Sequence, residues 1–220
     1  MSTSPKMALL EEYALIARAL SAPARLMLLE QLAQGQRGVE GLAEKTGLTV
    51  ANCSQHLQQL RRAGLVTSHR EGKAVIYQLT DARTLDLMDL LRLLAERNLA
   101  RVEQILRALS DGQDAPEPVS REELAARLAE GSVTVLDMRP ADEYESAHIP
   151  GALNTTLADL ERLLPSLDAN KEVVAYCRGP YCIYSHQAVA ALRKHGLNAR
   201  RLEGGLPEWR EDGRQVISMV

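Results

Sequence analysis

Two cysteines, Cys177 and Cys182, bracket the run CRGPYC. The run follows the apolar segment EVVAY (172–176), which predicts a buried strand, and precedes IYSHQAVAALRKHG (183–196), which predicts a helix. A helix dipole and free backbone N–H groups converge at such a turn and stabilise an anion. We therefore expect Cys177 to be a nucleophilic thiolate near neutral pH, with the positive charge of Arg178 beside it. The alternative is a small buried cysteine in an α/β core.

Cys182 places a second thiol in the same loop. If the two side chains converge, Cys177 and Cys182 can close as a disulfide or as a polysulfide bridge. A reversible bridge suits a sensor or a resolving step better than bulk turnover of a substrate.

A second set of polar residues lies on the segment TVANCSQHLQQLRRAG (49–64). Thr49 is placed to cap this helix and Gly64 to end it. A short helix precedes it at 39–47, and a β-hairpin with a Glu-Gly-Lys turn follows it at 65–80. Helix, turn, helix and hairpin in this order predict a winged helix-turn-helix whose second helix reads the major groove.

Side-chain chemistry supports a DNA-reading role for this helix and hairpin. Asn and Gln pair bidentately with adenine, Ser contacts bases or phosphate, and Arg and Lys hold phosphates. The alternative is a solvated helix face, with His56 packed at the surface. The residues that we expect to face DNA are Thr49, Asn52, Ser54, Gln55, His56, Gln58, Arg61, Arg62, Arg70 and Lys73.

Cys53 lies inside the same helix. We favour a packed residue that faces the first helices, because free cysteine is usually buried. The alternative is a redox site whose modification would disturb DNA contacts directly.

The whole chain has 220 residues, 45% of them hydrophobic and 25% charged, which suits one large or two small packed domains. Its three cysteines do not make a disulfide framework and fit a reducing, cytoplasmic compartment. The amphipathic N-terminus lacks the apolar core of a signal peptide, and no apolar run reaches the ~18 residues of a membrane span. Residues 45–80 hold five basic residues and one acid, Glu71, a balance that suits a duplex-binding face.

The segment SDGQDAPEPVS (110–120) has the composition of a linker. Before it the pattern is mostly helical and ends in one long amphipathic helix over 81–109, of the kind that often carries an oligomer interface. After it, helices alternate with apolar strands, which predicts a mostly parallel sheet covered by helices on both faces. The expected domains are 1–112 for DNA binding and dimerisation, a linker at 113–119, and an α/β domain at 120–220.

Three segments of the first half, SAPARLMLLEQLAQG (21–35), GLTVANCSQHLQQLRRAGLV (47–66) and HREGKAVIYQL (69–79), resemble the ArsR family of winged-helix repressors. The resemblance implies an α+β winged helix-turn-helix, mostly α with a β-hairpin wing. It also implies a homodimer, joined by its first and last helices, that binds a double-stranded operator and releases it on a chemical signal. Many members sense metals with cysteines before the reading helix or with Asp and His on the last helix. This chain has VEGL at 39–42 and no His over 81–110, so we expect no metal and no cofactor.

The second half resembles the rhodanese family in VLDMRPADEYESAHIPGALN (135–154), CRGPYC and LEGGLPEWR (202–210). The resemblance implies an α/β domain that takes sulfur from a small donor, carries it as a persulfide on Cys177 and passes it to a thiol acceptor. The family loop usually has Gly at its fourth position, where this chain has Pro180, which lacks an N–H donor. The implied site residues are Cys177, Arg178, Gly179, Tyr181 and Cys182 in the loop, with Asp137 and Arg139 bracing it.

Three functions fit these observations. The first is a transcriptional repressor that senses or handles reactive sulfur through its loop cysteine, with no membrane partner. The second is a thiosulfate or persulfide sulfurtransferase whose DNA-binding half only regulates its own operon. The third treats the second domain as an inactive docking module. Whether Cys53, Cys177 or Cys182 is the sensing thiol stays open at this point.

Overall fold

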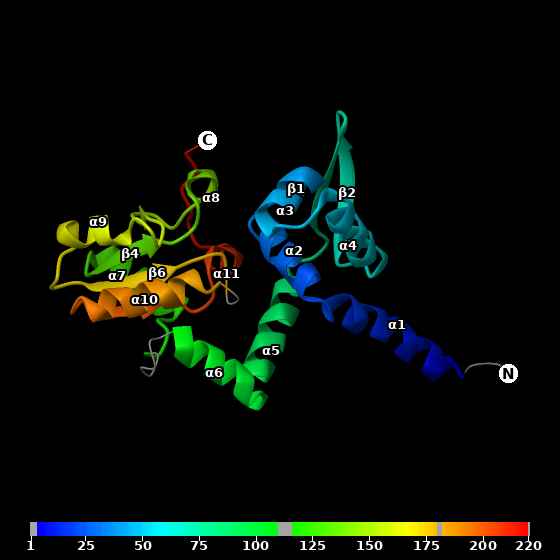
Figure 1. The fold of residues 1–220 in the computed structure, drawn as a ribbon, viewed down its shortest axis with the longest axis horizontal. Coiled ribbons are helices and arrows are strands. Elements are labelled where there is room, and N and C mark those ends of the chain that lie inside the picture. Colours follow the sequence, from blue (N-terminus) through cyan, green and yellow to red (C-terminus); the bar gives the residue numbers. More distant parts are fainter. Residues whose placement is uncertain (1–3, 110–115, 180–181, 220) are drawn as a thin grey trace. The chain divides into compact units, whose positions relative to one another are not determined.

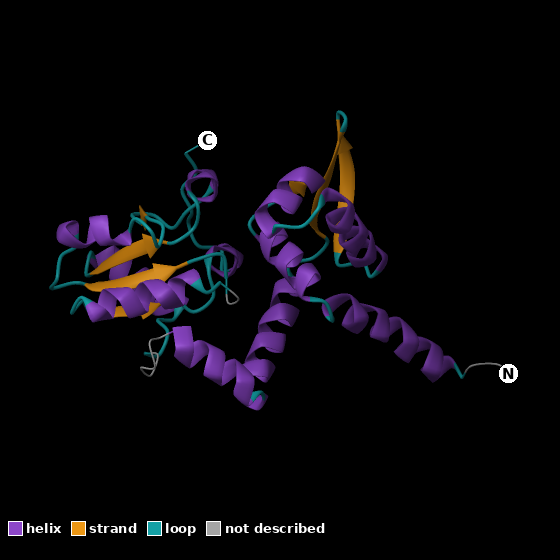
Figure 2. Ribbon diagram, viewed as in Figure 1, coloured by secondary structure: helices purple, strands orange, loops and turns teal. Residues whose placement is uncertain are grey.

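The computed structural model describes residues 4–109, 116–179 and 182–219. Figure 1 and Figure 2 show its helices and strands. The chain divides into two compact units, Met1–Met88 and Asp89–Val220.

The first unit holds a winged helix-turn-helix, as its sequence pattern predicts. Its elements are α1 (Pro5–Leu20), α2 (Pro23–Ala33), β1 (Arg37–Gly38), α3 (Val39–Thr46), α4 (Val50–Arg62), β2 (Val66–Glu71) and β3 (Ala74–Leu79), and α5 (Arg83–Asn98) begins in it. The three strands form an antiparallel sheet in the order β1-β3-β2, in which β2 and β3 are the wing. Gly47 ends α3 in a left-handed conformation that favours glycine, and Thr49 then caps α4 by accepting the N–H of Asn52 at 3.2 Å.

Leucines at helical spacing bury the inner faces of α2, α3 and α4. Leu28 and Leu29 on α2, Leu42 on α3, and Leu57 and Leu60 on α4 are all fully buried. This packing holds α4 by one face and leaves its opposite face to solvent.

The long helix expected over 81–109 is interrupted, so that prediction is wrong in detail. α5 ends at Asn98, and α6 (Ala100–Leu109) begins after Leu99. The side-chain amide of Asn98 donates to the carbonyl of Leu94 at 2.8 Å. Asparagine competes in this way with the helix backbone, which explains a break at this position.

The second unit contains the α/β domain. After α5 and α6 come α7 (Arg121–Glu130), β4 (Val133–Asp137), α8 (Ala141–Ser146), β5 (Leu153–Asn154), α9 (Leu160–Leu163), a 3₁₀ turn (Leu164–Ser166), β6 (Glu172–Tyr176), α10 (Tyr184–Lys194), β7 (Ala199–Arg201) and α11 (Leu206–Glu211). The four strands are parallel in the order β5-β4-β6-β7, which confirms the predicted sheet. In parallel sheets, binding and catalytic sites lie beyond the carboxyl ends of the strands, and the loop of Cys177 follows the carboxyl end of β6.

Side chains of β6 alternate between two apolar layers. Val174 and Tyr176 pack into the layer that also holds Trp209 of α11. Val173 and Ala175 pack into the opposite layer, which Cys177 and Cys182 extend. The sulfur atoms therefore continue the apolar face on which α10 lies.

The predicted linker falls partly on residues 113–115, which lie outside the described ranges. Val119 already belongs to the α/β domain, because its N–H donates to the carbonyl of Arg201 at 2.7 Å. The predicted domain bounds stay a prediction. None of the helices in the described ranges combines the length and apolarity that crossing a membrane would require.

An ion network ties α7 and β7 to the central strand through Glu172. Its carboxylate accepts from Arg200 at 2.8 and 2.9 Å and pairs with Arg127. The hydrogen bonds from Arg200, followed by those from Arg127, hold the pKa of Glu172 below its usual range.

We expect Glu172→Gln to lower the free energy of unfolding by about 1–2 kcal/mol at pH 7, since each hydrogen bond to a charged group contributes about that much. Because the folded pKa is lowered, this stabilisation is present above the ordinary pKa of a glutamate and is lost as the pH falls through the folded value. Urea denaturation at neutral and at acid pH measures it. An equal difference between wild type and variant at both pH values would contradict the assignment.

Candidate functional site

The loop after β6 brings its two cysteines together. Cys177 and Cys182 are joined by a disulfide, with their Cα atoms 6.1 Å apart. Both are buried, Cys177 at 1% exposure and Cys182 at 5%. The two cysteines can therefore exist as a pair of thiols or as a disulfide, two states that differ by two electrons.

Gly205 presses its backbone against this loop. A Cβ at Gly205 would lie 2.6 Å from the carbonyl oxygen of Cys177 and 2.6 Å from the amide nitrogen of Gly179, closer than real Cβ atoms approach. The next residue, Leu206, donates its N–H to the same Cys177 oxygen at 3.4 Å. The φ of Gly205 is −158°, an extended value that any residue can adopt. Glycine is therefore required at this position by the lack of space for a Cβ and not by the backbone torsion.

Two loop residues are not placed. Pro180 and Tyr181 lie outside the described ranges, so the expected role of Tyr181 and the expected cradle of N–H donors stay predictions. In the described part, the N–H of Cys182 donates to the carbonyl of Gly179 at 3.1 Å.

Arg178 is paired rather than free. Its guanidinium donates to both carboxylate oxygens of Glu143 on α8, at 2.8 and 2.9 Å, and Glu143 is itself buried. The positive charge expected beside Cys177 is therefore compensated, and the Arg178 side chain anchors the loop to α8. Sequence reasoning did not single out Glu143, although an acid on a helix after the Asp137 strand is a natural partner for a loop arginine.

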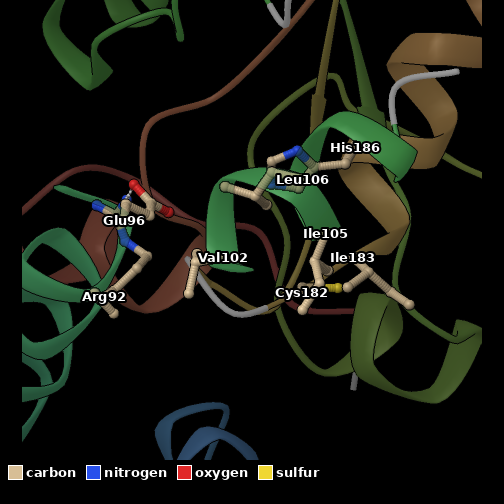
Figure 3. Close-up of a pocket in the computed structure, with 9 residues that line it drawn as sticks. Arg92, Glu96, Val102, Ile105, Leu106, Cys182, Ile183 and His186 are labelled. Carbon is tan, nitrogen blue, oxygen red and sulfur yellow. Dashed lines mark hydrogen bonds and ion pairs between the residues drawn. The ribbon is translucent and has the colours of Figure 1, made fainter. Parts of the chain in front are cut away.

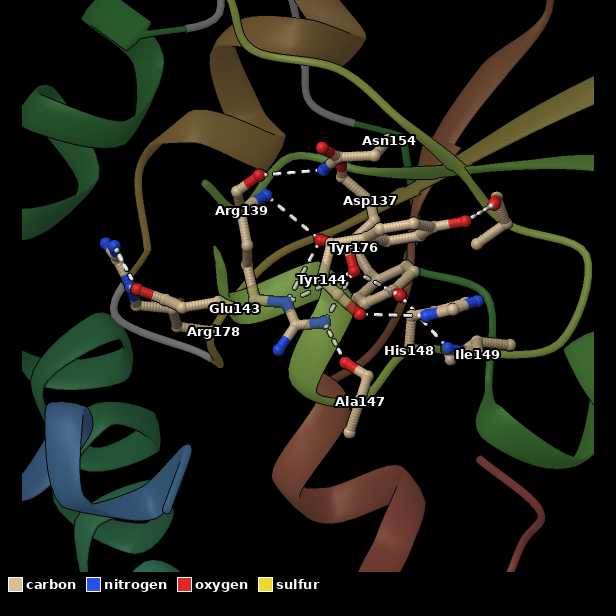
Figure 4. A network of polar contacts seen from close by, with 11 residues as sticks. Asp137, Arg139, Glu143, Tyr144, Ala147, His148, Ile149, Asn154, Tyr176 and Arg178 are labelled. Carbon is tan, nitrogen blue, oxygen red and sulfur yellow. Dashed lines mark hydrogen bonds and ion pairs between the residues drawn. The ribbon is translucent and has the colours of Figure 1, made fainter. Parts of the chain in front are cut away.

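Asp137 and Arg139 form a buried pair at the end of β4, next to β6 (Figure 4). The carboxylate of Asp137 accepts from the guanidinium of Arg139 at 2.6 Å and from the hydroxyl of Tyr176 at 2.5 Å. Arg139 also donates to the carbonyl of Ala147 at 2.6 Å. Burial, followed by the charge of Asp137, raises the pKa of Tyr176, so the phenol keeps the proton that it donates. Tyr176 directly precedes Cys177, and the pair thus braces the strand end that presents the sulfur.

Further contacts in Figure 4 fix the neighbouring backbone. The amide of Asn154 donates to the carbonyls of Asp137 and Arg139 at 3.1 and 2.8 Å, and the N–H of Ile149 donates to the hydroxyl of Tyr176 at 3.1 Å. His148 is hydrogen-bonded through Nδ1 to the carbonyl of Tyr144 at 2.8 Å. These residues hold turns in place, and their chemistry is structural.

Glu208 is a site residue that sequence reasoning missed. Its carboxylate accepts the N–H of Gly205 at 2.8 Å, and its oxygens lie within 4 Å of where a Cβ on Gly179 would be. Burial raises the pKa of Glu208.

In the first unit, α4 exposes most of the residues that were expected to face DNA. Thr49, Asn52, Gln55, Gln58, Arg61, Arg62, Arg70 and Lys73 are exposed. Ser54 and His56 are half-buried, and Nδ1 of His56 is buried without a partner among the described residues. Arg61 donates to the hydroxyl of Ser68 at 3.3 Å, which links α4 to the wing.

Cys53 faces away from that exposed surface. It is fully buried, and its sulfur lies 3.7 Å from the carbonyl oxygen of Val39. Burial, followed by the charge of Glu40, raises the pKa of its thiol. These properties favour the packed role over the redox role. Within the described ranges no group of three or more His, Cys, Asp or Glu side chains is arranged to hold a metal.

Arg25 is the residue of the first unit that sequence reasoning missed. From α2 it donates to the carbonyls of Ala19 and Arg18 at the end of α1, at 2.5 and 2.7 Å. It also donates to the side-chain oxygen of Gln59 on α4 at 2.6 Å. One buried guanidinium thus ties the position of α4 to the end of α1.

Comparisons with known proteins assign the two halves of the chain to two different families. Residues 22–68 match the model of the bacterial regulatory protein arsR family, and residues 120–212 match that of the rhodanese-like domain. The HTH-type transcriptional regulator Rv0324 of Mycobacterium tuberculosis is 39% identical over 96% of this chain and 92% of its own length. The biofilm growth-associated repressor of Agrobacterium fabrum is 39% identical over 36% of this chain and 68% of its own.

Among solved structures, the winged helix-turn-helix domain of Mb0332 from Mycobacterium bovis is described as homodimeric and DNA-binding. It is 35% identical, covers 45% of this chain and 92% of its own, and superposes with a TM-score of 0.41.

Gly205→Ala should displace the loop, because the new methyl group overlaps the backbone at Cys177 and Gly179. We expect the equilibrium constant for closing Cys177–Cys182 against glutathione to fall at least tenfold, with a loss of about 1–3 kcal/mol in stability, as overpacking typically causes. Gly38→Ala is the control, because a Cβ there meets its nearest atom at an ordinary 3.6 Å. An unchanged closing constant in Gly205→Ala would refute the packing argument.

Gln55→Ala and Arg70→Ala should weaken DNA binding in different ways. Losing a base contact at Gln55 should cost about 1–3 kcal/mol on the preferred sequence only and relax base preference. Losing a phosphate contact at Arg70 should weaken all sequences and flatten the dependence of affinity on salt. Fluorescence anisotropy with specific and scrambled duplexes at several salt concentrations separates the two, and identical effects of both variants would contradict the assignment.

Proposed function

The chain belongs to the arsR family of bacterial transcriptional regulators and carries a rhodanese-like domain, and on that premise we propose that it is a repressor whose operator affinity responds to reactive sulfur at Cys177 and Cys182. The observation that carries the proposal is the disulfide between these cysteines in the loop after β6. A DNA-binding regulator acts in the cytoplasm, where thiols are otherwise kept reduced.

Sulfane sulfur supplies the oxidant that closes this bridge. The Cys177 thiolate attacks the outer sulfur of a persulfide or polysulfide, forms a Cys177 persulfide and releases the donor as a thiolate. The Cys182 thiolate then attacks the inner sulfur of that persulfide, forms the Cys177–Cys182 disulfide and releases hydrosulfide. Two thiols are oxidised and one sulfane sulfur is reduced, so the electrons balance.

The geometry favours a sensor over a sulfurtransferase. Turnover needs the Cys177 persulfide to meet a second substrate in every cycle, whereas the sulfur of Cys182 already lies within bonding distance in the same loop. A resolving cysteine diverts the persulfide into a stable bridge. The sulfurtransferase alternative would require the Cys177 persulfide to outlive attack by Cys182.

Exposed leucines and other apolar side chains on α1 and α5 support a homodimer. Leu9, Leu10 and Tyr13 on α1, and Leu90 and Leu94 on α5, are all at least 46% exposed. Apolar surface of this extent on two helices is typical of an interface. Since α5 starts in the first unit and continues through Asp89 into the second, a change in the second unit can reach the DNA-binding unit along one helix.

Polysulfide should lower operator affinity about 5–150-fold, the usual size of coupling between two sites. The effect should vanish in Cys177→Ser and in Cys182→Ser, because neither variant can close the bridge. Anisotropy titration of an operator duplex, before and after polysulfide, measures it.

Cys53→Ser is the matched control for this titration, because its buried thiol is outside the loop and the response should persist. Rhodanese turnover of thiosulfate and cyanide is assayed on the same preparations. If polysulfide leaves the operator affinity of the wild type unchanged and the same protein turns over thiosulfate rapidly, the sulfurtransferase function replaces the sensor function.

A further inference from the structure

A cavity of about 280 Å³ lies in the second unit where α5 and α6 meet the start of α10. Its walls are mostly apolar, from Ala95 on α5, Val102, Ile105 and Leu106 on α6, and Ile183 before α10. Ile105 and Ile183 are 48% and 46% exposed, so the mouth of the cavity is open and apolar. A volume near 300 Å³ is the lower end of the range of small-molecule sites.

Cys182 lines this cavity, and Cys177 is not among the lining residues. Figure 3 shows the Cys182 side chain on the same side as Ile105 and Ile183, with Arg92 and Glu96 on the other. Of the two bridged cysteines, Cys182 is therefore the one that borders the cavity.

The polar groups of the cavity carry little net charge. Arg92 donates to Glu96 at 2.7 Å and to Asp89 at 2.7 Å, so its charge is compensated. Burial, followed by the charges of Arg201 and Arg92, lowers the pKa of His186 to about 4, so its ring is neutral at pH 7. The cavity thus suits an uncharged ligand with an apolar body better than a charged one.

We propose that this cavity binds a small uncharged thiol with an apolar body and directs its sulfur to Cys182, so that the Cys177–Cys182 bridge is opened from the Cys182 side. The proposal deepens the repressor function proposed above, because it names the class of molecule that resets the bridge. The role of the thiol in resetting the repressor rests on that proposed function, whereas the exchange reaction itself can be tested without DNA.

The reaction is a thiol–disulfide exchange. The ligand thiol loses its proton, its sulfur forms a bond to the sulfur of Cys182, and the bond between Cys182 and Cys177 breaks. Cys177 leaves with the electron pair of that bond and takes up a proton in exchange, so no external oxidant or reductant is needed. A second ligand thiol then releases Cys182 as a free thiol and leaves as the ligand disulfide.

The test uses the oxidised full-length chain with two probe thiols, benzyl mercaptan, which is uncharged and aromatic, and 2-mercaptoethanesulfonate, which is charged. The rate at which each thiol opens the protein bridge is divided by the rate at which the same thiol reduces glutathione disulfide, which corrects for the intrinsic reactivity of each thiol. We expect benzyl mercaptan to open the bridge at least tenfold faster than the charged thiol on this scale. After acid quenching and alkylation, mass spectrometry should find the benzyl adduct on Cys182 and the alkyl group on Cys177.

Ala95→Phe fills the cavity and should reduce the preference for benzyl mercaptan at least fivefold. Ala100→Phe is the matched control, because Ala100 is exposed on α6 and does not line the cavity, so the preference should persist. Benzyl alcohol, which lacks the thiol, should inhibit the wild-type reaction saturably, a measurement that holds even where Ala95→Phe does not fold.

An adduct on Cys177, equal corrected rates for the two thiols, or no inhibition by benzyl alcohol would overturn the proposal. None of these readouts involves operator DNA. If these readouts are as expected and polysulfide does not change operator affinity, the cavity proposal stands and the repressor proposal fails. If polysulfide changes operator affinity but these readouts fail, the repressor proposal stands and the cavity proposal fails.

Discussion

The packing of Gly205 against the loop of Cys177 is the constraint on which the second unit depends. With no room for a Cβ between the two backbones, the carbonyl of Cys177 and the amide of Gly179 have one arrangement, and the disulfide to Cys182 closes within it. The buried pair of Asp137 and Arg139 fixes the strand end on which this loop begins. The disulfide therefore lies between a closely packed backbone contact on one side and the start of α10 on the other.

The bonded cysteines of the loop and the packed cysteine of α4 lie in different units of the chain. Cys53 lies on the buried face of the DNA-reading helix, with a raised pKa that keeps its thiol protonated, while the loop holds two cysteines in bonding distance. In the proposed repressor, coupling between the units can pass along α5, the helix that both units share. Linkage also requires that bound operator oppose the sulfur signal by the same free energy.

Most of the fold follows from local pattern, whereas the site depended on contacts between distant segments. Continuous apolar runs that alternate with helices predicted the parallel strands, and the cap at Thr49 predicted the start of α4. The break at Leu99 was missed because it depends on one side chain, Asn98, turning back on its own helix. Glu143 and Arg25 were missed because their partners lie far away in the sequence, and residue spacing carries no signal for such pairs. Glu208 was missed because its approach to Gly179 also joins distant segments.

The central claim is that the state of the Cys177–Cys182 bond sets operator affinity. The most direct measurement titrates the full-length chain through a series of redox buffers and determines two quantities on each sample, the bridged fraction by mass spectrometry and the operator-bound fraction by anisotropy. The account predicts that both quantities change with the same midpoint, with release of DNA as the bridge closes. Operator binding that stays constant across the titration while the bridge opens and closes would contradict it.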